Sequence, residues 1–132
     1  MNKKAMALIG TGILAACTVG AMTASADDSI SIGFALRTAN GSYYASIGDI
    51  VQATCDDLGW ECTVLDANND TTKELENMET LAASGVDLIF LDCVDPSAAT
   101  ASQQAAYDAG IPVINLDSGV DDMSMQVTTV YS

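Results

Sequence analysis

The chain has 132 residues, of which 18 are acidic and only 4 are basic, so its net charge is −14. This length allows one domain, and the negative charge excludes nucleic-acid backbones and anionic membrane surfaces as natural partners, because both require positive charge on the protein. The chain contains no histidine, so neither a zinc site nor another cofactor is expected.

Residues 1–26 are predicted to be a signal peptide. A positively charged start precedes an uncharged stretch that ends at Ala24-Ser25-Ala26, which is the pattern of a secretory signal with a small-x-small cleavage site. We expect residues 27–132 to be exported to the periplasm, with two basic residues left against all 18 acidic ones. The alternatives are an uncleaved membrane anchor and a lipid anchor on Cys17, which ends a lipobox-like Leu-Ala-Ala-Cys.

Strand and helix patterns alternate along the rest of the chain. Apolar runs predict strands at 30–36, 60–65, 86–91 and 111–116, and helical spacing predicts helices at 43–58, 71–84 and 96–109. Thr71 and Glu74 form a capping-box pattern, and Asp95 followed by a proline indicates another helix start. The first helix is expected to bury a face formed by Tyr44, Ile47, Ile50, Val51 and Leu58.

One unit occurs three times: a helical pattern, a glycine, and an apolar run that closes with Leu-Asp. The glycines are Gly59, Gly85 and Gly110, which are 26 and 25 residues apart, and the closing aspartates are Asp66, Asp92 and Asp117. Each glycine is expected to be the left-handed residue that ends a helix. The fold class is therefore α/β, with a doubly wound, mostly parallel sheet flanked by helices. The three aspartates then share the carboxyl edge, where such sheets bind ligands.

Residues that follow the strands are the candidate ligand contacts. Tyr43 and Tyr44 start the first helix, and we expect one ring to stack on the apolar face of a sugar while the other packs under the loop. Asp117 can accept two hydrogen bonds from neighbouring hydroxyls, or it can cap the next segment. Asp92 is a further candidate, although loop solvation or helix capping explains both Asp92 and Asp66 equally well.

Arg37 stands out because it ends the first strand of a strongly acidic chain. It could pair with Asp117 or present its guanidinium to a ligand oxygen. Asn40, in the polar loop that follows, is another candidate ligand contact. Trp60 begins a strand at the opposite edge and Tyr107 lies on the outer part of a helix, so both are assigned to packing.

The cysteines allow two interpretations. Cys55, near the end of one helix, and Cys62, in the following strand, could form a disulfide across a short loop in an exported protein. They could also be buried thiols that pack as small apolar groups. Cys93 is left over in either case.

Together these residues resemble the periplasmic sugar-binding proteins of the ribose-binding type, which deliver solutes to ABC transporters. The resemblance runs over 29–117 and is most specific in the segment 109–117, AGIPVINLD. In that family the aromatic pair after the first strand stacks on the ligand, and the aspartate closing the fourth strand binds its hydroxyls, which are the positions of Tyr43, Tyr44 and Asp117. The resemblance implies a monomer that captures a sugar or polyol for a membrane permease.

The chain departs from the family pattern at two positions. Ser118 stands where an arginine often follows the aspartate, and Arg37 stands where a small polar residue often ends the first strand. We hypothesise that Arg37 supplies the missing guanidinium. The resemblance also implies a second lobe, so residues 27–132 are interpreted as an incomplete N-terminal lobe, and the chain as a fragment that binds sugar weakly or not at all.

Two other functions are the alternatives to solute transport. The same fold could act as an exported ligand sensor for a chemoreceptor or kinase. An aspartate-based enzyme such as a receiver domain would need acidic residues after the first strand and a lysine after the last, whereas Arg37 follows the first strand and Lys73 opens the second helix. No nucleophile and base pair is visible without histidine, so the chain is not expected to be an enzyme.

Overall fold

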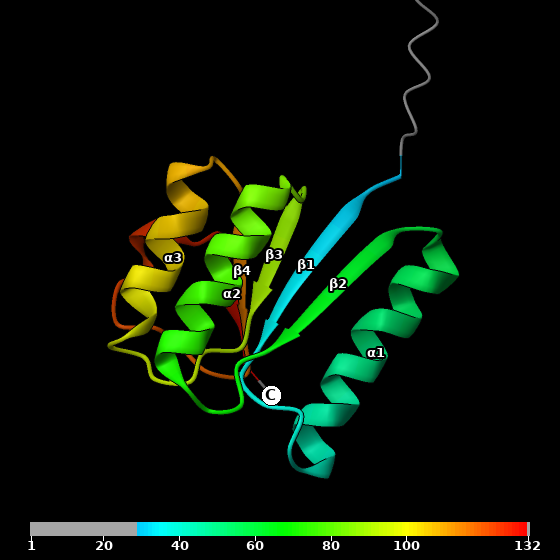
Figure 1. Cartoon of the computed structure of the whole chain (residues 1–132), viewed down its shortest axis with the longest axis horizontal. Helices are drawn as coiled ribbons and strands as arrows, with labels where there is room; N and C mark the ends of the chain where they lie inside the picture. Colours follow the sequence, from blue (N-terminus) through cyan, green and yellow to red (C-terminus); the bar gives the residue numbers. More distant parts are fainter. Residues whose placement is uncertain (1–28, 132) are drawn as a thin grey trace, which may run out of the picture.

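The computed structural model describes residues 29–131; the predicted signal peptide and Cys17 lie outside this range. The described chain forms a five-stranded sheet with helices on both faces (Figure 1). The strands are β1 (Ser31–Leu36), β2 (Glu61–Asp66), β3 (Leu88–Leu91), β4 (Val113–Leu116) and β5 (Thr128–Val130). Their order is β2-β1-β3-β4-β5, and every neighbouring pair is parallel. The predicted α/β fold with a parallel, doubly wound sheet is confirmed.

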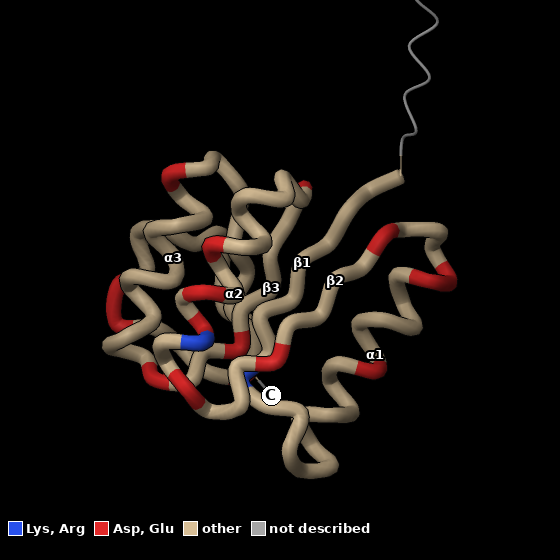
Figure 2. The backbone as a smooth tube through the Cα atoms, viewed as in Figure 1, with Lys and Arg blue, Asp and Glu red and all other residues tan. Residues whose placement is uncertain are grey.

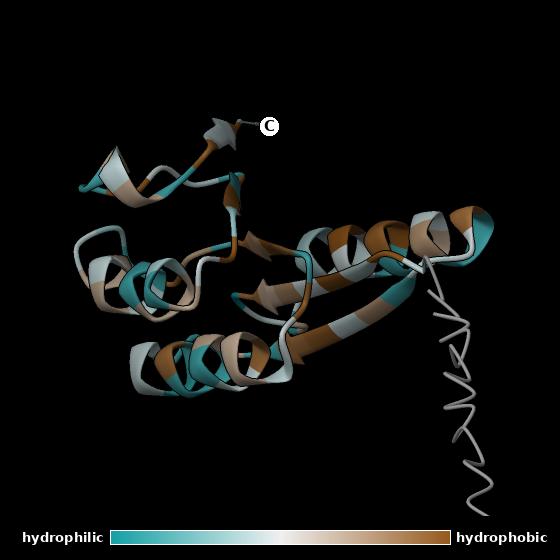
Figure 3. Cartoon of the chain, turned by 90° about the horizontal axis from the view of Figure 1, so that it is seen from above, coloured by the Kyte–Doolittle hydropathy of each residue, from teal (hydrophilic) through white to brown (hydrophobic). Residues whose placement is uncertain are grey.

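The helices are α1 (Ser42–Leu58), α2 (Thr71–Ser84) and α3 (Ala99–Asp108), followed by the short 3-10 helix η1 (Met123–Met125). Seen from above, α1 covers one face of the sheet, and α2 and α3 cover the other (Figure 3). None of the helices within residues 29–131 has both the length and the apolar character needed to cross a membrane.

Two glycines lie where helices pack against the sheet, one on each face. A Cβ on Gly33 of β1 would lie 2.9 Å from Leu81 of α2, and a Cβ on Gly48 of α1 would lie 3.4 Å from Leu36. Substitution of Gly33 would therefore displace Leu81, which is fully buried. At Gly48 the added Cβ would make only an ordinary van der Waals contact, so Gly33 is the position where a close approach requires glycine.

The glycines of the repeated unit have the predicted backbone conformation. Gly59 and Gly85 cap α1 and α2 with φ of 70° and 71°, and Gly110 follows α3 with φ of 72°. Residues that carry a Cβ rarely adopt this left-handed backbone conformation, whereas glycine adopts it with little strain. Each reversal sends the chain back into the sheet with its strand pointing to the same edge.

Three elements begin two or more residues later than predicted, and one of them is β4, which begins at Val113 rather than at residue 111. Strand β3 begins at Leu88 rather than at residue 86, because the Asp87 carboxylate accepts hydrogen bonds from the backbone N–H and hydroxyl of Ser31, both at 2.8 Å. Regular helix α3 begins at Ala99 rather than at residue 96. Asp95 still caps the preceding turn, since its carboxylate accepts from the backbone N–H of Ala98 at 3.0 Å.

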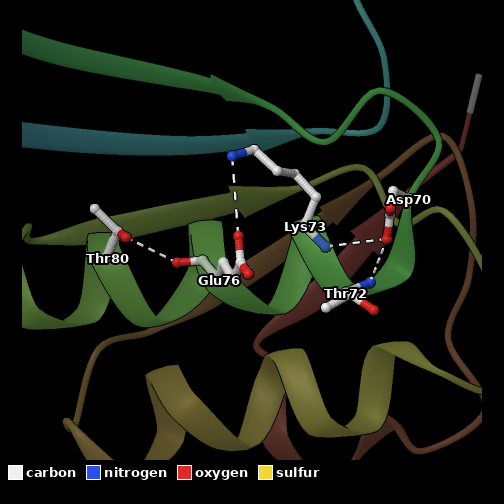
Figure 4. Close-up of polar contacts among 5 residues, drawn as sticks. All are labelled: Asp70, Thr72, Lys73, Glu76 and Thr80. Carbon is white, nitrogen blue, oxygen red and sulfur yellow. Dashed lines mark hydrogen bonds and ion pairs between the residues drawn. The ribbon is translucent and has the colours of Figure 1, made fainter.

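The predicted capping box at the start of α2 is wrong. Asp70 is the N-cap, and its carboxylate accepts from the backbone N–H groups of Thr72 (2.8 Å) and Lys73 (3.2 Å), as Figure 4 shows. The same view shows the Lys73–Glu76 ion pair of 3.9 Å. The Glu74 side chain is instead buried and turns towards the β3–α3 loop.

The predicted apolar face of α1 is also partly wrong. Ile50 is 63% exposed and Leu58 is 53% exposed. The residues of α1 that are buried against the sheet are Gly48 and Cys55. Ile50 lines the rim of a small pocket between α1 and the sheet, and Leu58 is the last helical residue, so both stay largely exposed.

Candidate functional site

The carboxyl ends of β1 to β4 meet at one edge of the sheet, the lower edge in Figure 1. The chain runs outward from β1 in both directions, so this edge contains the switch point where open α/β sheets form their ligand crevice. The loops and the helix start at this edge carry every predicted ligand contact: Arg37, Asn40, Tyr43, Tyr44, Asp92 and Asp117.

Tyr43 and Asp117 are in direct contact although they are far apart in the sequence. The Tyr43 hydroxyl donates a hydrogen bond of 2.8 Å to Oδ1 of Asp117. Asp117 has φ of 63°, a left-handed conformation that a non-glycine residue adopts infrequently. Its backbone N–H donates to the carbonyl of Val130 at 2.8 Å, which ties the turn to β5. The turn after β4 thus directs the carboxylate towards the start of α1.

The second tyrosine links this pair to Arg37. The rings of Tyr43 and Tyr44 meet edge to face, with centroids 5.1 Å apart and planes at 75°. The guanidinium carbon of Arg37 lies 5.7 Å from the centroid of the Tyr44 ring, within range of a cation–π interaction. Tyr43 is 47% exposed and Tyr44 is half-buried. A row from Arg37 through both rings to Asp117 therefore lines the edge.

Asn40 and Arg37 also contact the loop that follows β2. The Asn40 side-chain amide donates to Oδ1 of Asn68 at 2.7 Å, and Nε of Arg37 donates to Oδ1 of Asn69 at 3.1 Å. Asn68 and Asn69 both have positive φ, 51° and 59°, and the Asp66 carboxylate accepts from the Asn68 backbone N–H at 2.7 Å. Asp66 therefore forms a turn, the simpler of its two predicted roles.

Asp92 lies beneath this row. Its side chain has no exposed surface, and neither of its carboxylate oxygens has a hydrogen-bond partner within residues 29–131. The pKa of Asp92 is raised to about 7, mainly by burial and then by the negative charge of Asp117, while the Arg37 guanidinium opposes the rise. A ligand could reach this carboxylate only after the groups that cover it had moved.

Glu74 supports the loop that carries Asp92 and was not predicted to do so. Its carboxylate accepts from the backbone N–H of Val94 at 2.5 Å and from the Ser102 hydroxyl at 2.8 Å. Burial raises its pKa, while these two hydrogen bonds lower it. The position of Glu74, three residues after Thr71, predicted a role in capping the helix. Its actual partners, Val94 and Ser102, are 20 and 28 residues away in the sequence, so no local pattern could predict them.

The described residues form one open wall rather than an enclosed pocket. A hollow of about 190 Å³ adjoins the Tyr43–Asp117 contact and is also lined by Ile47, Leu116, Val130 and Tyr131. A larger hollow, of about 530 Å³, lies between the end of α3 and the segment 124–127 and contains none of the predicted site residues. Tyr107 lines it and is 58% exposed, so its assignment to packing was wrong. Trp60 is half-buried just before β2, at the edge predicted for it.

The charged residues of the described chain are mostly acidic. Arg37 and Lys73 are the basic residues of the described chain, and acidic residues are spread over its elements (Figure 2). Lys73 pairs with Glu76 on α2. No cluster of three or more metal-ligating side chains occurs within residues 29–131.

Comparison with known proteins identifies the family of this chain. Residues 32–131 match the family model of the periplasmic binding protein domain, so the chain belongs to that family. It is 33% identical over 117 residues to the ribose import binding protein of Escherichia coli K12. The alignment covers 89% of this chain and 38% of that protein. The predicted resemblance to periplasmic sugar-binding proteins is confirmed, and the family is one of solute-binding domains rather than enzymes.

Solved structures show the same relation. A galactofuranose-binding protein superposes with a TM-score of 0.73 at 25% identity, over 78% of this chain and 36% of its own. An ABC transporter solute-binding protein from Mycobacterium smegmatis with bound glycerol gives 0.73 at 31% identity, over 77% and 35%. This chain spans about a third of the length of each of these two proteins.

Proposed function

We propose that this chain is a partial N-terminal lobe of the solute-binding component of an ABC transporter, and that its carboxyl edge is one wall of a sugar or polyol site. The ligand would lie against Tyr43 and Tyr44, with Arg37, Asn40 and Asp117 in reach of its polar groups. A second lobe would supply the opposite wall and close over the ligand.

The contact between Tyr43 and Asp117 carries the proposal. The Tyr43 hydroxyl lies 2.8 Å from a carboxylate oxygen of Asp117, so a tyrosine and a carboxylate are neighbours at the sheet edge where ligands bind. A sugar offers an apolar ring face and adjacent hydroxyl donors, which match an exposed tyrosine ring and a carboxylate acceptor. Asp92, which is buried below, would contribute only if ligand binding uncovered it.

The partner and location follow from the family as part of the same proposal. We propose export to the periplasm and delivery of the ligand by a monomer to a membrane permease, without enzymatic activity. A role as the ligand sensor of a chemoreceptor or kinase would use the same wall. Measuring whether the ligand-bound protein binds a membrane permease or a receptor would separate the two roles.

Isothermal titration calorimetry with ribose, glycerol and other sugars, sugar acids and polyols tests the proposal. Because the described residues form an open wall, we expect this chain to bind no more tightly than the millimolar range, about −4 kcal/mol. A longer protein that includes the second lobe should bind one of these ligands at micromolar concentration or below. Failure of that longer protein to bind any sugar, sugar acid or polyol would overturn the proposed function.

A further inference from the structure

The end of α1 and the start of β2 bring two cysteines together. Cys55 lies in the last turn of α1 and is 3% exposed, whereas Cys62 is half-buried in β2. Cys62 pairs with Ile32 across the parallel ladder, so both side chains point to the same face of the sheet. Cys55 lines a small apolar pocket with Ile32. Both cysteines therefore occupy the space between α1 and the sheet.

The turn between them and their mutual interaction support this proximity. The Cys55 carbonyl accepts a hydrogen bond of 2.9 Å from the backbone N–H of Trp60, and left-handed Gly59 reverses the chain. Burial, followed by the neighbouring Cys55 thiol, raises the pKa of Cys62 to about 12. Both residues are free thiols in the structure.

We propose that Cys55 and Cys62 form an intramolecular disulfide by exchange with a low-molecular-weight disulfide such as oxidised glutathione. The more exposed Cys62 reacts first: its thiolate attacks one glutathione sulfur and releases glutathione thiolate, which takes up a proton. Cys55 loses its proton, attacks the Cys62 sulfur of the mixed disulfide and releases the second glutathione. Two protein thiols are thus oxidised and one glutathione disulfide is reduced to two thiols.

The bond would fasten the carboxyl-terminal end of α1 to the sheet. Tyr43 and Tyr44 lie at the other end of the same helix, so a fixed helix holds the aromatic row in place. Closing a short loop also restricts the unfolded chain, which raises the melting temperature. The inference does not depend on the proposed function, because it concerns bond formation and stability without a ligand.

Mass spectrometry of the whole chain after incubation with oxidised glutathione tests the inference. We expect the mass to fall by two hydrogens, and a proteolytic peptide pair to contain Cys55 joined to Cys62. The reaction should be faster at pH 9 than at pH 7, because thiolate is scarce at neutral pH. The melting temperature should rise by about 5 to 10 °C and return to its starting value with reductant.

Variants separate this bond from other cysteine chemistry. Cys55→Ser should stop at the mixed disulfide on Cys62, whereas Cys93→Ala should still form the bond and show the same rise in melting temperature. Recovery of both Cys55 and Cys62 as alkylatable thiols after oxidation of the wild-type chain at pH 9 would overturn the inference. A bridge from either residue to Cys17 or Cys93 would also overturn it.

Discussion

Arg37 is held at the rim by contacts on two sides. Asn69 accepts a hydrogen bond from its Nε at 3.1 Å, and the Tyr44 ring lies 5.7 Å from its guanidinium carbon. These contacts use one N–H and one face of the guanidinium, so its terminal N–H groups remain able to bind a ligand oxygen. Its role as a replacement for the arginine often found at position 118 stays a prediction.

We predict that Arg37→Ala weakens ligand binding at least tenfold. A hydrogen bond to a charged group contributes about 1.5 to 3 kcal/mol, which corresponds to roughly a 10- to 100-fold change in Kd. The measurement is calorimetry on the longer, two-lobe protein, with Lys73→Ala as the matched control because Lys73 pairs with Glu76 on α2. Unchanged affinity in Arg37→Ala would remove Arg37 from the site.

At the scale of elements, Glu74 joins α2 to the β3–α3 loop and to α3. Its two oxygens accept from the backbone N–H of Val94 and from the Ser102 hydroxyl in a buried position. Because that loop also contains Asp92, these hydrogen bonds help to hold Asp92 in position at the carboxyl edge of the sheet. Asp70, not Glu74, caps the helix.

We predict that Glu74→Gln lowers the free energy of unfolding by about 1 to 3 kcal/mol. The side-chain NH₂ of the glutamine would face either the Val94 N–H or the Ser102 hydroxyl, both of which donate to Glu74 in the wild-type chain. Urea denaturation monitored by circular dichroism provides the measurement. Glu76→Gln is the control, since the Glu76 side chain is 62% exposed and its ion pair is 3.9 Å long. If both variants lose the same stability, the network contributes nothing specific.

Local patterns predicted the elements because helix ends and buried strands leave strong short-range signals. The left-handed glycines and Asp95 function as their sequence contexts indicate. The contact of Tyr43 with Asp117 could be anticipated only as a shared edge, since it joins residues 74 positions apart. The burial of Asp92 and the contacts of Glu74 depend on tertiary packing, and no local spacing encodes them.

At the scale of the whole molecule, an acidic chain buries two carboxyl groups whose pKa values are raised. Burial is the main cause that raises the pKa of both Asp92 and Glu74 in the folded state. Asp87, Asp95 and Asp122 have lowered pKa values because they accept hydrogen bonds. The two groups of residues therefore act in different pH ranges.

We predict that the chain is more stable at pH 5 than at pH 8. A carboxyl whose pKa rises from 3.8 to about 7 on folding contributes stability below pH 3.8 that is lost as the pH rises towards 7. Thermal unfolding should show a loss of about 2 kcal/mol between pH 5 and pH 8. Asp92→Asn should flatten this dependence, whereas an equally steep profile in that variant would exclude Asp92 as its source.

The most direct test of the central claim is a map of where a sugar contacts this chain. Two-dimensional NMR of the labelled chain, titrated with millimolar ribose, galactofuranose or glycerol, reports binding that calorimetry would miss. We predict amide shifts confined to residues 37–44 and 117–119, lost in Tyr43→Ala and retained in Tyr107→Ala. Shifts centred on the hollow beside Tyr107, or equal shifts in both variants, would contradict the account.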